Sequence, residues 1–291
     1  MPAYRYSLTD PVDSLSCQPM LLVSAGRSGT TLLRSMLVVS GQIAIPPEGQ
    51  VIGTAARKYL AYRAMGWKDI SRLIVSLFET SSQFPLWEIT LAPVYERVLA
   101  LPAGERSLAR IVDEVYKEYI WQHFPEAKMW GDQSPIHSVF LPWLEQTFPE
   151  ARYLHLLRDG RDVVASMVEM GVFLQYAMER WQVSVERARA AGQRLSARNF
   201  LEVRYEDLVQ EPATVLQEVC GFLGIDYDPG MLMYWKANST VEHQYFQRHK
   251  NLGRPLFTES IGRWVERLSE EEQVAMLGEI GPLLRRVGYG V

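Results

Sequence analysis

The chain has 291 residues, 47% of them hydrophobic, and its 30 lysines and arginines against 34 acidic residues give a formal net charge of −4. This length and apolar content suffice for a large buried core and lie within the single-domain range of α/β folds. The near balance of charge excludes a global basic field that would recruit nucleic acid or an anionic membrane. Any site for an anion must therefore be local.

The cysteines and the first residues predict a cytoplasmic protein without a metal site. Cys17 and Cys220 lie far apart and have no metal-ligand spacing, which argues against a disulfide framework and against zinc. Residues 1–6 show no basic stretch followed by an apolar run, so they do not resemble a secretory signal. The apolar stretch 20–45 is interrupted by arginines and glycines and is too polar to span a bilayer.

The first predicted element is a buried strand over residues 19–24, where an apolar run stops at a glycine-rich turn. Residues 30–40 then repeat apolar side chains at helical spacing and end before Gly41, which predicts a helix with a glycine C-cap. The chain therefore begins with a strand, a glycine turn and a helix.

Residues 53–125 form a helical segment, with the clearest periods at 70–78 and 108–121. We expect one domain, residues 1–291, in which this segment is an insertion between sheet strands and not a second core. The aromatic residues of the insertion, and a second group nearer the C-terminus, either line an acceptor pocket or pack in the core. The two groups are Tyr59, Tyr62, Trp67, Phe78, Phe84, Trp87 and Tyr95, and then Tyr227, Tyr234, Trp235, Tyr245, Phe246 and Phe257.

Later strands alternate with helices. Strands are predicted at 151–157 and 200–203, with a weaker one at 127–130, and helices follow at 163–167 and 212–223. This alternation predicts an α/β fold of three layers, with a central, mostly parallel sheet covered by helices on both faces.

The turn at residues 24–31 carries the first sign of chemistry. Its glycines let backbone N–H groups turn inward and the next helix offers its positive end, so the turn can hold a phosphate or phosphosulfate. An ordinary strand-to-helix turn is the alternative. A nucleotide triphosphatase would carry a Gly-Lys pair followed by Ser or Thr, for the phosphates and magnesium, and this chain has no Gly-Lys pair. We therefore expect a P-loop-like loop, with Arg27 inside it, that binds its ligand without a metal.

This loop resembles the 5'-phosphosulfate loop of the sulfotransferases that use 3'-phosphoadenosine 5'-phosphosulfate (PAPS), in particular their tyrosylprotein-like and bacterial branch. The resemblance implies that the loop holds the phosphosulfate of PAPS. The residues that match are Gly26, Arg27, Ser28, Gly29, Thr30 and Thr31.

Residues 158–166 resemble the 3'-phosphate motif of the same family. In that motif an arginine at a strand end and a serine two helical turns later grip the 3'-phosphate, and Arg158 and Ser166 match these positions. Within the segment, Asp159 and Asp162 resemble a capping pair at the start of a helix.

Two further segments extend the resemblance to about residues 20–270. Tyr205 matches the family tyrosine that lies near the adenine. Residues 260–264 resemble the late segment that folds over the cofactor, which implies cofactor contacts for Gly262, Arg263 and Trp264.

Two residues are candidates for the general base that would remove the acceptor proton. Glu48 follows a predicted strand end, at the position where the tyrosylprotein branch and its bacterial relatives carry a catalytic glutamate; without the resemblance it could be a loop charge. His137 is the alternative, because an imidazole titrates near neutral pH, although a histidine at a helix start is often structural.

The chain departs from the family at Gln133. Many relatives carry a lysine there, which donates to the bridging oxygen or to the sulfo group, whereas an amide donates without a charge and stabilises the leaving group less. Arg27 can compensate for the missing charge.

The sequence therefore predicts a metal-independent sulfotransferase that moves a sulfo group from PAPS to a hydroxyl or amine of a small-molecule or carrier-tethered acceptor. A module that binds the nucleotide without catalysis is one alternative, for which Gln133 is the main sign, and a kinase of related architecture is another. Neither the acceptor nor the oligomeric state follows from the sequence, and a homodimer stays open.

Overall fold

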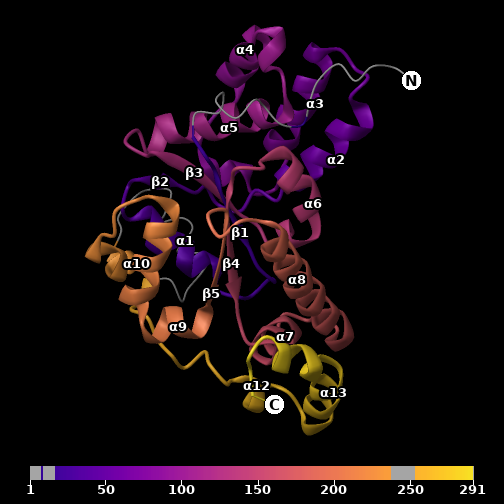
Figure 1. Ribbon diagram of the computed structural model, residues 1–291, viewed down its shortest axis with the longest axis vertical. Coiled ribbons are helices and arrows are strands. Elements are labelled where there is room, and N and C mark those ends of the chain that lie inside the picture. Colours follow the sequence, from indigo (N-terminus) through magenta and orange to yellow (C-terminus); the bar gives the residue numbers. More distant parts are fainter. Residues whose placement is uncertain (1–7, 9–16, 237–252, 291) are drawn as a thin grey trace.

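The computed structural model describes residue 8, residues 17–236 and residues 253–290 (Figure 1). The N-terminal segment 1–6 used above to predict a cytoplasmic location lies outside the described residues, as do Tyr245 and Phe246. Within the described part of the chain, no helix combines the length and the apolar character needed to cross a membrane.

A parallel sheet of five strands forms the centre of the fold, in the order β2-β3-β1-β4-β5. The strands are β1 (Met20–Val23), β2 (Ile43–Ala44), β3 (Met129–Gln133), β4 (Arg152–Leu157) and β5 (Phe200–Arg204). The central strand β1 pairs Leu22 with Gln133 on one side and with Leu154 on the other. Since all strands run the same way, their carboxyl ends meet at one edge, where ligands bind in open α/β sheets.

Helices cover both faces of this sheet, which confirms the predicted α/β class. Figure 1 shows α1, α9 and α10 on one side of the sheet and α6 and α8 on the other. Along β1 the side chains of Met20 and Leu22 join one buried cluster, while Leu21 and Val23 join another. This is the two-sided burial expected of a strand inside a parallel sheet.

The α-helices outside the insertion are α1 (Thr30–Val38), α6 (His137–Thr147), α7 (Gly160–Val168), α8 (Leu174–Arg194), α9 (Tyr205–Gln210), α10 (Pro212–Leu223), α12 (Trp264–Arg267) and α13 (Glu270–Arg286). A 3₁₀ segment, η3 (Pro229–Lys236), follows α10.

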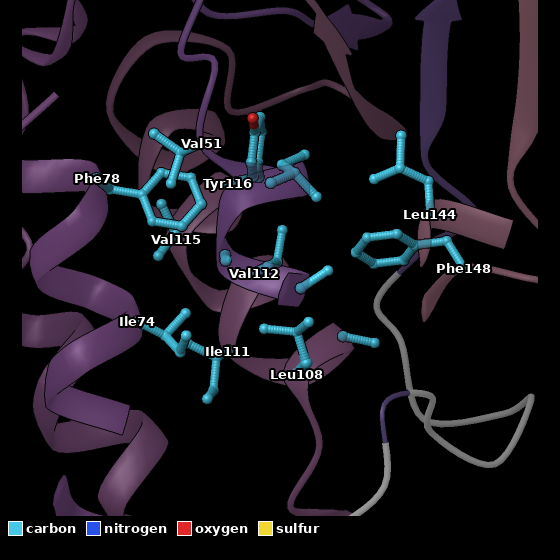
Figure 2. Packing of buried hydrophobic residues seen from close by; sticks show 14 of the residues in the cluster. Val51, Ile74, Phe78, Leu108, Ile111, Val112, Val115, Tyr116, Leu144 and Phe148 are labelled. Atoms are coloured by element: carbon cyan, nitrogen blue, oxygen red, sulfur yellow. The ribbon is translucent and has the colours of Figure 1, made fainter. Parts of the chain in front are cut away.

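The segment between β2 and β3 is helical and packs onto the sheet. It contains α2 (Ile52–Tyr62), α3 (Trp67–Glu79), η1 (Phe84–Trp87), α4 (Ala92–Ala100), η2 (Ala103–Glu105) and α5 (Leu108–His123). Figure 2 shows α5 side chains such as Val112 between Ile74 and Phe78 of α3 and Leu144 and Phe148 at the end of α6. The same buried cluster includes Leu21 and Trp130 of the sheet, so the insertion helices and the strands share one apolar core.

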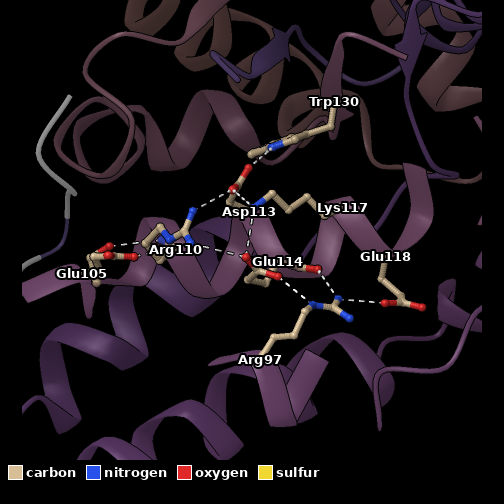
Figure 3. A network of polar contacts seen from close by, with 9 residues as sticks. Arg97, Glu105, Arg110, Asp113, Glu114, Lys117, Glu118 and Trp130 are labelled. Atoms are coloured by element: carbon tan, nitrogen blue, oxygen red, sulfur yellow. Dashed lines mark hydrogen bonds and ion pairs between the residues drawn. The ribbon is translucent and has the colours of Figure 1, made fainter. Parts of the chain in front are cut away.

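A buried polar network also ties the insertion to the sheet (Figure 3). Arg97 of α4 pairs with Glu114 and Glu118 of α5, each at 2.8 Å. Asp113, the residue before Glu114, accepts a hydrogen bond from the Trp130 indole of β3 at 2.9 Å. Helix α5 is thereby fixed between α4 and the strand that leads to the candidate site.

Two predicted local features differ in the structure. The weak strand predicted at 127–130 lies two to three residues further on, because β3 continues to Gln133 through its pairing with β1. Asp159 does cap α7, by accepting from the backbone N–H of Arg161 at 2.9 Å, but Asp162 does not complete a capping pair. Its carboxylate instead accepts from the N–H groups of Gly262 and Trp264.

Glu202 connects β5 to β4 and α8 through polar contacts, and its removal should destabilise the fold. His155 of β4 lies opposite it in register and donates at 2.9 Å, and Arg189 of α8 pairs with it at 2.7 Å. Burial alone would raise the pKa of Glu202, but these hydrogen bonds lower it to about 2. A carboxylate with a lowered pKa stabilises the folded state above the unfolded pKa of about 4.3 and loses this contribution as the pH falls toward 2.

We therefore expect Glu202→Gln to lower the free energy of unfolding by about 1–3 kcal/mol at pH 7 and by less at pH 3, measured by urea denaturation. Glu186→Gln is the matched control, because the Glu186–Arg286 pair is exposed and should contribute under about 1 kcal/mol. Equal losses in the two variants would contradict the prediction.

Candidate active site

The glycine turn joins β1 to α1 and leaves the first N–H groups of that helix without intrahelical acceptors. Gly29 is the N-cap residue with φ +95°, a left-handed conformation that favours glycine, and no side chain caps the helix. A Cβ at this position would lie 2.5 Å from the ring of Tyr205. The turn thus needs glycine for its conformation and for its close approach to a ring, and it presents a helix end suited to an anion.

A cavity of about 660 Å³ opens beside this turn, within the size range of small-molecule sites, about 300–1,000 Å³. Four arginines line it, against the carboxylates of Glu48 and Glu169. The residues that line it are Gly26, Arg27, Gly29, Thr30, Thr31, Leu32, Glu48, Pro135, Arg158, Ser166, Glu169, Met170, Tyr205, Tyr234, Leu256, Phe257, Ser260, Arg263 and Arg267.

The two residues that match the 3'-phosphate motif lie in this cavity next to the turn. Arg158 donates to the carbonyl oxygens of Arg27 and Ser260, at 2.9 and 2.8 Å, and its guanidinium lies 4.2 Å from the centre of the Tyr205 ring. Ser166 accepts from Arg27 Nε at 3.2 Å. The first and second sequence motifs, 131 residues apart, therefore meet in one place.

Arg27 lies in a strongly positive part of the cavity. Desolvation and the charges of Arg158 and Arg267 lower the pKa of Arg27, and Glu169 opposes this effect. Glu169 also forms an ion pair with Arg267 at 2.8 Å. Repulsion among the arginines is the electrostatic signature of a site that a polyanion would stabilise.

The late segment 260–264 folds against the start of α7. Asp162 accepts from the N–H groups of Gly262 and Trp264 at 2.8 and 3.1 Å, and burial raises the pKa of Asp162 while these bonds lower it. Ser260 shares a 2.8 Å hydrogen bond with the Tyr205 hydroxyl, and Arg263 lines the cavity. Gly262 and Trp264 therefore hold the segment in place rather than line the cavity.

Glu48 reaches the cavity from a loop that is anchored on both sides. The buried Arg34 of α1 donates to the carbonyl oxygen of Ile45 at 2.7 Å, and the Trp87 indole donates to that of Pro47 at 2.8 Å. Ser81 donates to the carbonyl oxygen of Gly49 at 3.2 Å. Helix α1 and the insertion thus hold the backbone of the loop that carries Glu48.

The pKa of Glu48 is raised, first by burial and further by the charge of Asp132. A hydrogen bond from Gln50 and the electrostatic effect of His137 lower the pKa of Glu48. A carboxylate with a raised pKa is a stronger base, as a general base near neutral pH requires.

Three residues predicted at the site lie below its surface. His137 begins α6 and is 0% exposed, with Nε2 at 2.5 Å from Asp132 Oδ1, while Gln133 and Ser28 are each 1% exposed. None of the three lines the cavity. Of the two candidate bases, Glu48 lines the cavity, whereas His137 is buried and does not line it.

Two of the aromatic residues considered for an acceptor pocket, Tyr234 and Phe257, line the cavity, whereas Tyr59, Trp67, Phe78 and Trp87 of the insertion are buried in the core. Leu256 also lines the cavity and was missed by sequence reasoning. Met170 and Arg267 line it as well. The available signal for Arg267 was its position four residues after Arg263, at the end of the segment that resembles the family's cofactor-covering motif. No sequence signal placed Met170 there.

Within the described ranges, no group of three or more histidine, cysteine, aspartate or glutamate side chains is arranged to hold a metal ion.

The parallel sheet and the glycine turn before α1 define an α/β protein of P-loop-like architecture. Residues 19–229, more than half of the chain, match the model of the sulfotransferase family. The chain belongs to this family of transferases.

Individual relatives are distant in sequence. The chain is 24% identical over 281 residues to protein-tyrosine sulfotransferase A of Caenorhabditis elegans, which covers 90% of this chain and 65% of that protein. It is 25% identical to the omega-hydroxy-beta-dihydromenaquinone-9 sulfotransferase Stf3 of Mycobacterium bovis, over 78% of this chain and 71% of that one. The chain thus spans just under two thirds of the nematode protein.

Solved structures share the fold. The sulfotransferase domain of the Synechococcus PCC 7002 olefin synthase superposes with a TM-score of 0.63 at 21% identity, covering 94% of this chain and 98% of that one. A mouse sulfotransferase, SULT7A1, complexed with PAP, superposes with a TM-score of 0.50 at 13% identity, over 95% and 86% of the two chains.

Proposed function

We propose that the protein transfers a sulfo group from PAPS to a hydroxyl or amine of a small-molecule or carrier-tethered acceptor. The observation that carries this proposal is the convergence of the glycine turn, Arg158, Ser166 and Glu48 on one cavity. The PAP complex of the mouse neighbour supports the donor.

The residues present fit such a donor. The Nε atom of Arg158 is buried and has no hydrogen-bond partner within the described structure, so it can still donate to a phosphate. The turn around Gly29 leaves helical N–H groups for a second anion. Tyr205, which matches the family tyrosine near the adenine, and Tyr234 both line the same cavity.

The donor supplies the sulfo group for an in-line displacement. Glu48 takes the proton of the acceptor as the acceptor atom bonds to sulfur, and the electron pair of the broken S–O bond stays on the phosphate oxygen. Arg27 and the N–H groups of the turn stabilise the charge that develops on that oxygen. In the resembling sulfotransferases a lysine contributes to this stabilisation, and this chain carries Gln133 at the matching position.

Recognition of the 3'-phosphate gives a direct test. The protein should bind 3'-phosphoadenosine 5'-phosphate more tightly than adenosine 5'-phosphate in calorimetry, and Arg158→Ala should reduce this preference by about 10- to 100-fold, because a charge-assisted hydrogen bond contributes about 1.5–3 kcal/mol.

Arg161→Ala is the matched control for this experiment. Arg161 lies three residues on, pairs with Asp159 at 2.6 Å and does not line the cavity, so the preference should persist. Equal affinities of the wild type for the two nucleotides would reject the donor. A strong preference without turnover on any hydroxyl or amine acceptor would favour a nucleotide-binding module without catalysis.

A further inference from the structure

A buried carboxylate next to the candidate base has no part in the reaction as described so far. Asp132 is the fourth residue of β3, is 1% exposed and does not line the cavity. It accepts hydrogen bonds from the Tyr116 hydroxyl of α5 and from His137 Nε2 of α6. A buried charge is costly unless it is paired and hydrogen-bonded, and these two donors meet that condition.

The fold places Asp132 beside the loop that carries Glu48. Strands β2 and β3 run parallel with Ala44 opposite Trp130, so the chain that leaves β2 follows the end of β3. A Cβ built on Gly49, the residue after Glu48, would lie 3.8 Å from Asp132 Oδ2. Arg34 and Trp87 bond to the carbonyl oxygens of Ile45 and Pro47, so the backbone of this loop is held next to the end of β3.

His137 contacts the same carboxylate from the start of α6. Its Nε2 atom lies 2.5 Å from Asp132 Oδ1, while the buried Nδ1 atom has no hydrogen-bond partner among the described residues. Asp132, Tyr116 and His137 therefore form one buried polar group below the loop that carries Glu48.

We propose that Asp132 is a positioning residue of the proposed sulfo transfer, whose negative charge strengthens Glu48 as the base for the acceptor proton. This inference rests on the proposed function. It explains why a carboxylate is buried together with Tyr116 and His137 at this place in the core.

The other polar and charged groups near Glu48 do not replace Asp132. Gln50 donates to Glu48 and so weakens it as a base. Arg34 is directed at backbone carbonyl oxygens. Across the cavity, Arg27 and Glu169 carry opposite charges. His137, which is bonded to Asp132, acts on Glu48 in the opposite direction to Asp132. Burial and the charge of Asp132 raise the pKa of Glu48, whereas Gln50 and His137 lower it.

The test is a ¹³C NMR titration of the Glu48 carboxyl carbon, assigned with Glu48→Gln. In Asp132→Asn the midpoint of Glu48 should move to lower pH, because a neighbouring like charge has been removed. In Tyr116→Phe, which removes a donor from the same cluster but keeps the carboxylate, such a fall is not expected. Asp113→Asn is a second control, because it neutralises an equally buried acid on α5 that is bonded to Trp130 instead.

An unchanged Glu48 midpoint in folded Asp132→Asn would overturn the proposal. A second measurement avoids a variant that fails to fold: in the wild type, the Asp132 carboxyl signal should show a step at the midpoint of Glu48, because coupled groups report each other's titration. The step should vanish in Glu48→Gln, and its absence from the wild type would also reject the proposal.

Activity gives a separate readout. If the protein turns over an acceptor, the acid limb of its pH–rate profile should move to lower pH in Asp132→Asn, as the NMR midpoint does. A shifted midpoint without turnover in any variant would retain the coupling and reject the sulfotransferase proposal, so the two failures can be told apart.

Discussion

Glu48→Gln should lower the rate of sulfo transfer by about 10²- to 10⁴-fold while leaving the affinity for 3'-phosphoadenosine 5'-phosphate nearly unchanged. The amide keeps the size and polarity of the side chain but cannot take the acceptor proton. Glu48 lies on a separate loop from the glycine turn and from Arg158, so the nucleotide contacts should persist. Single-turnover kinetics and calorimetry measure the two quantities.

His137→Gln separates the two candidate bases. His137 is fully buried and bonded to Asp132, so we expect its replacement to lower stability more than it lowers the rate of the folded fraction. A near-normal rate in Glu48→Gln together with loss of turnover in folded His137→Gln would exchange the two roles.

The sequence predicted the features that depend on local chemistry. An apolar run, two glycines and a helical repeat give the β1 turn and α1 without reference to the rest of the chain. The prolines after β2 likewise marked the loop that carries Glu48. Such segments keep the same conformational preferences in any context, which is why they could be read directly.

The features that depend on distant contacts were missed or misplaced. β3 extends to Gln133 because β1 lies beside it, a contact that the sequence of residues 127–133 does not reveal by itself. Asp162 looked like a capping residue, yet its partners lie 100 and 102 residues away. The meeting of Asp132 with Tyr116 likewise needs α5 to be placed by its apolar face and by Arg97.

The long helix α8 supports the site through a contact that the sequence pattern of the helix does not reveal. Many of its 21 residues are polar, and Ala177, Trp181, Val185 and Ala188 supply a narrow buried stripe. The Trp181 indole donates to the carbonyl oxygen of Arg158 at 3.1 Å, so this helix supports the candidate site without contributing a residue to its lining.

Gly29→Val should reduce the affinity for 3'-phosphoadenosine 5'-phosphate by about 100-fold or more, equivalent to about 2.7 kcal/mol. Left-handed backbone costs a residue with a Cβ about 1–2 kcal/mol, and a branched side chain is less able to relieve the crowding. In addition, the new Cβ would lie 2.5 Å from Tyr205, and this ring packs against the guanidinium of Arg158. One substitution should therefore disturb the turn and the arginine together.

Gly224→Val distinguishes this local effect from backbone strain. Gly224 ends α10 at φ +74°, a comparable left-handed conformation, but nothing lies within 4 Å of a Cβ built there and it does not line the cavity. We expect Gly224→Val to lower the free energy of unfolding and to keep the nucleotide affinity. If Gly29→Val is folded by circular dichroism and binds the nucleotide as the wild type does, the anion is held elsewhere, because no L-residue can occupy that turn without displacing either the backbone or the Tyr205 ring.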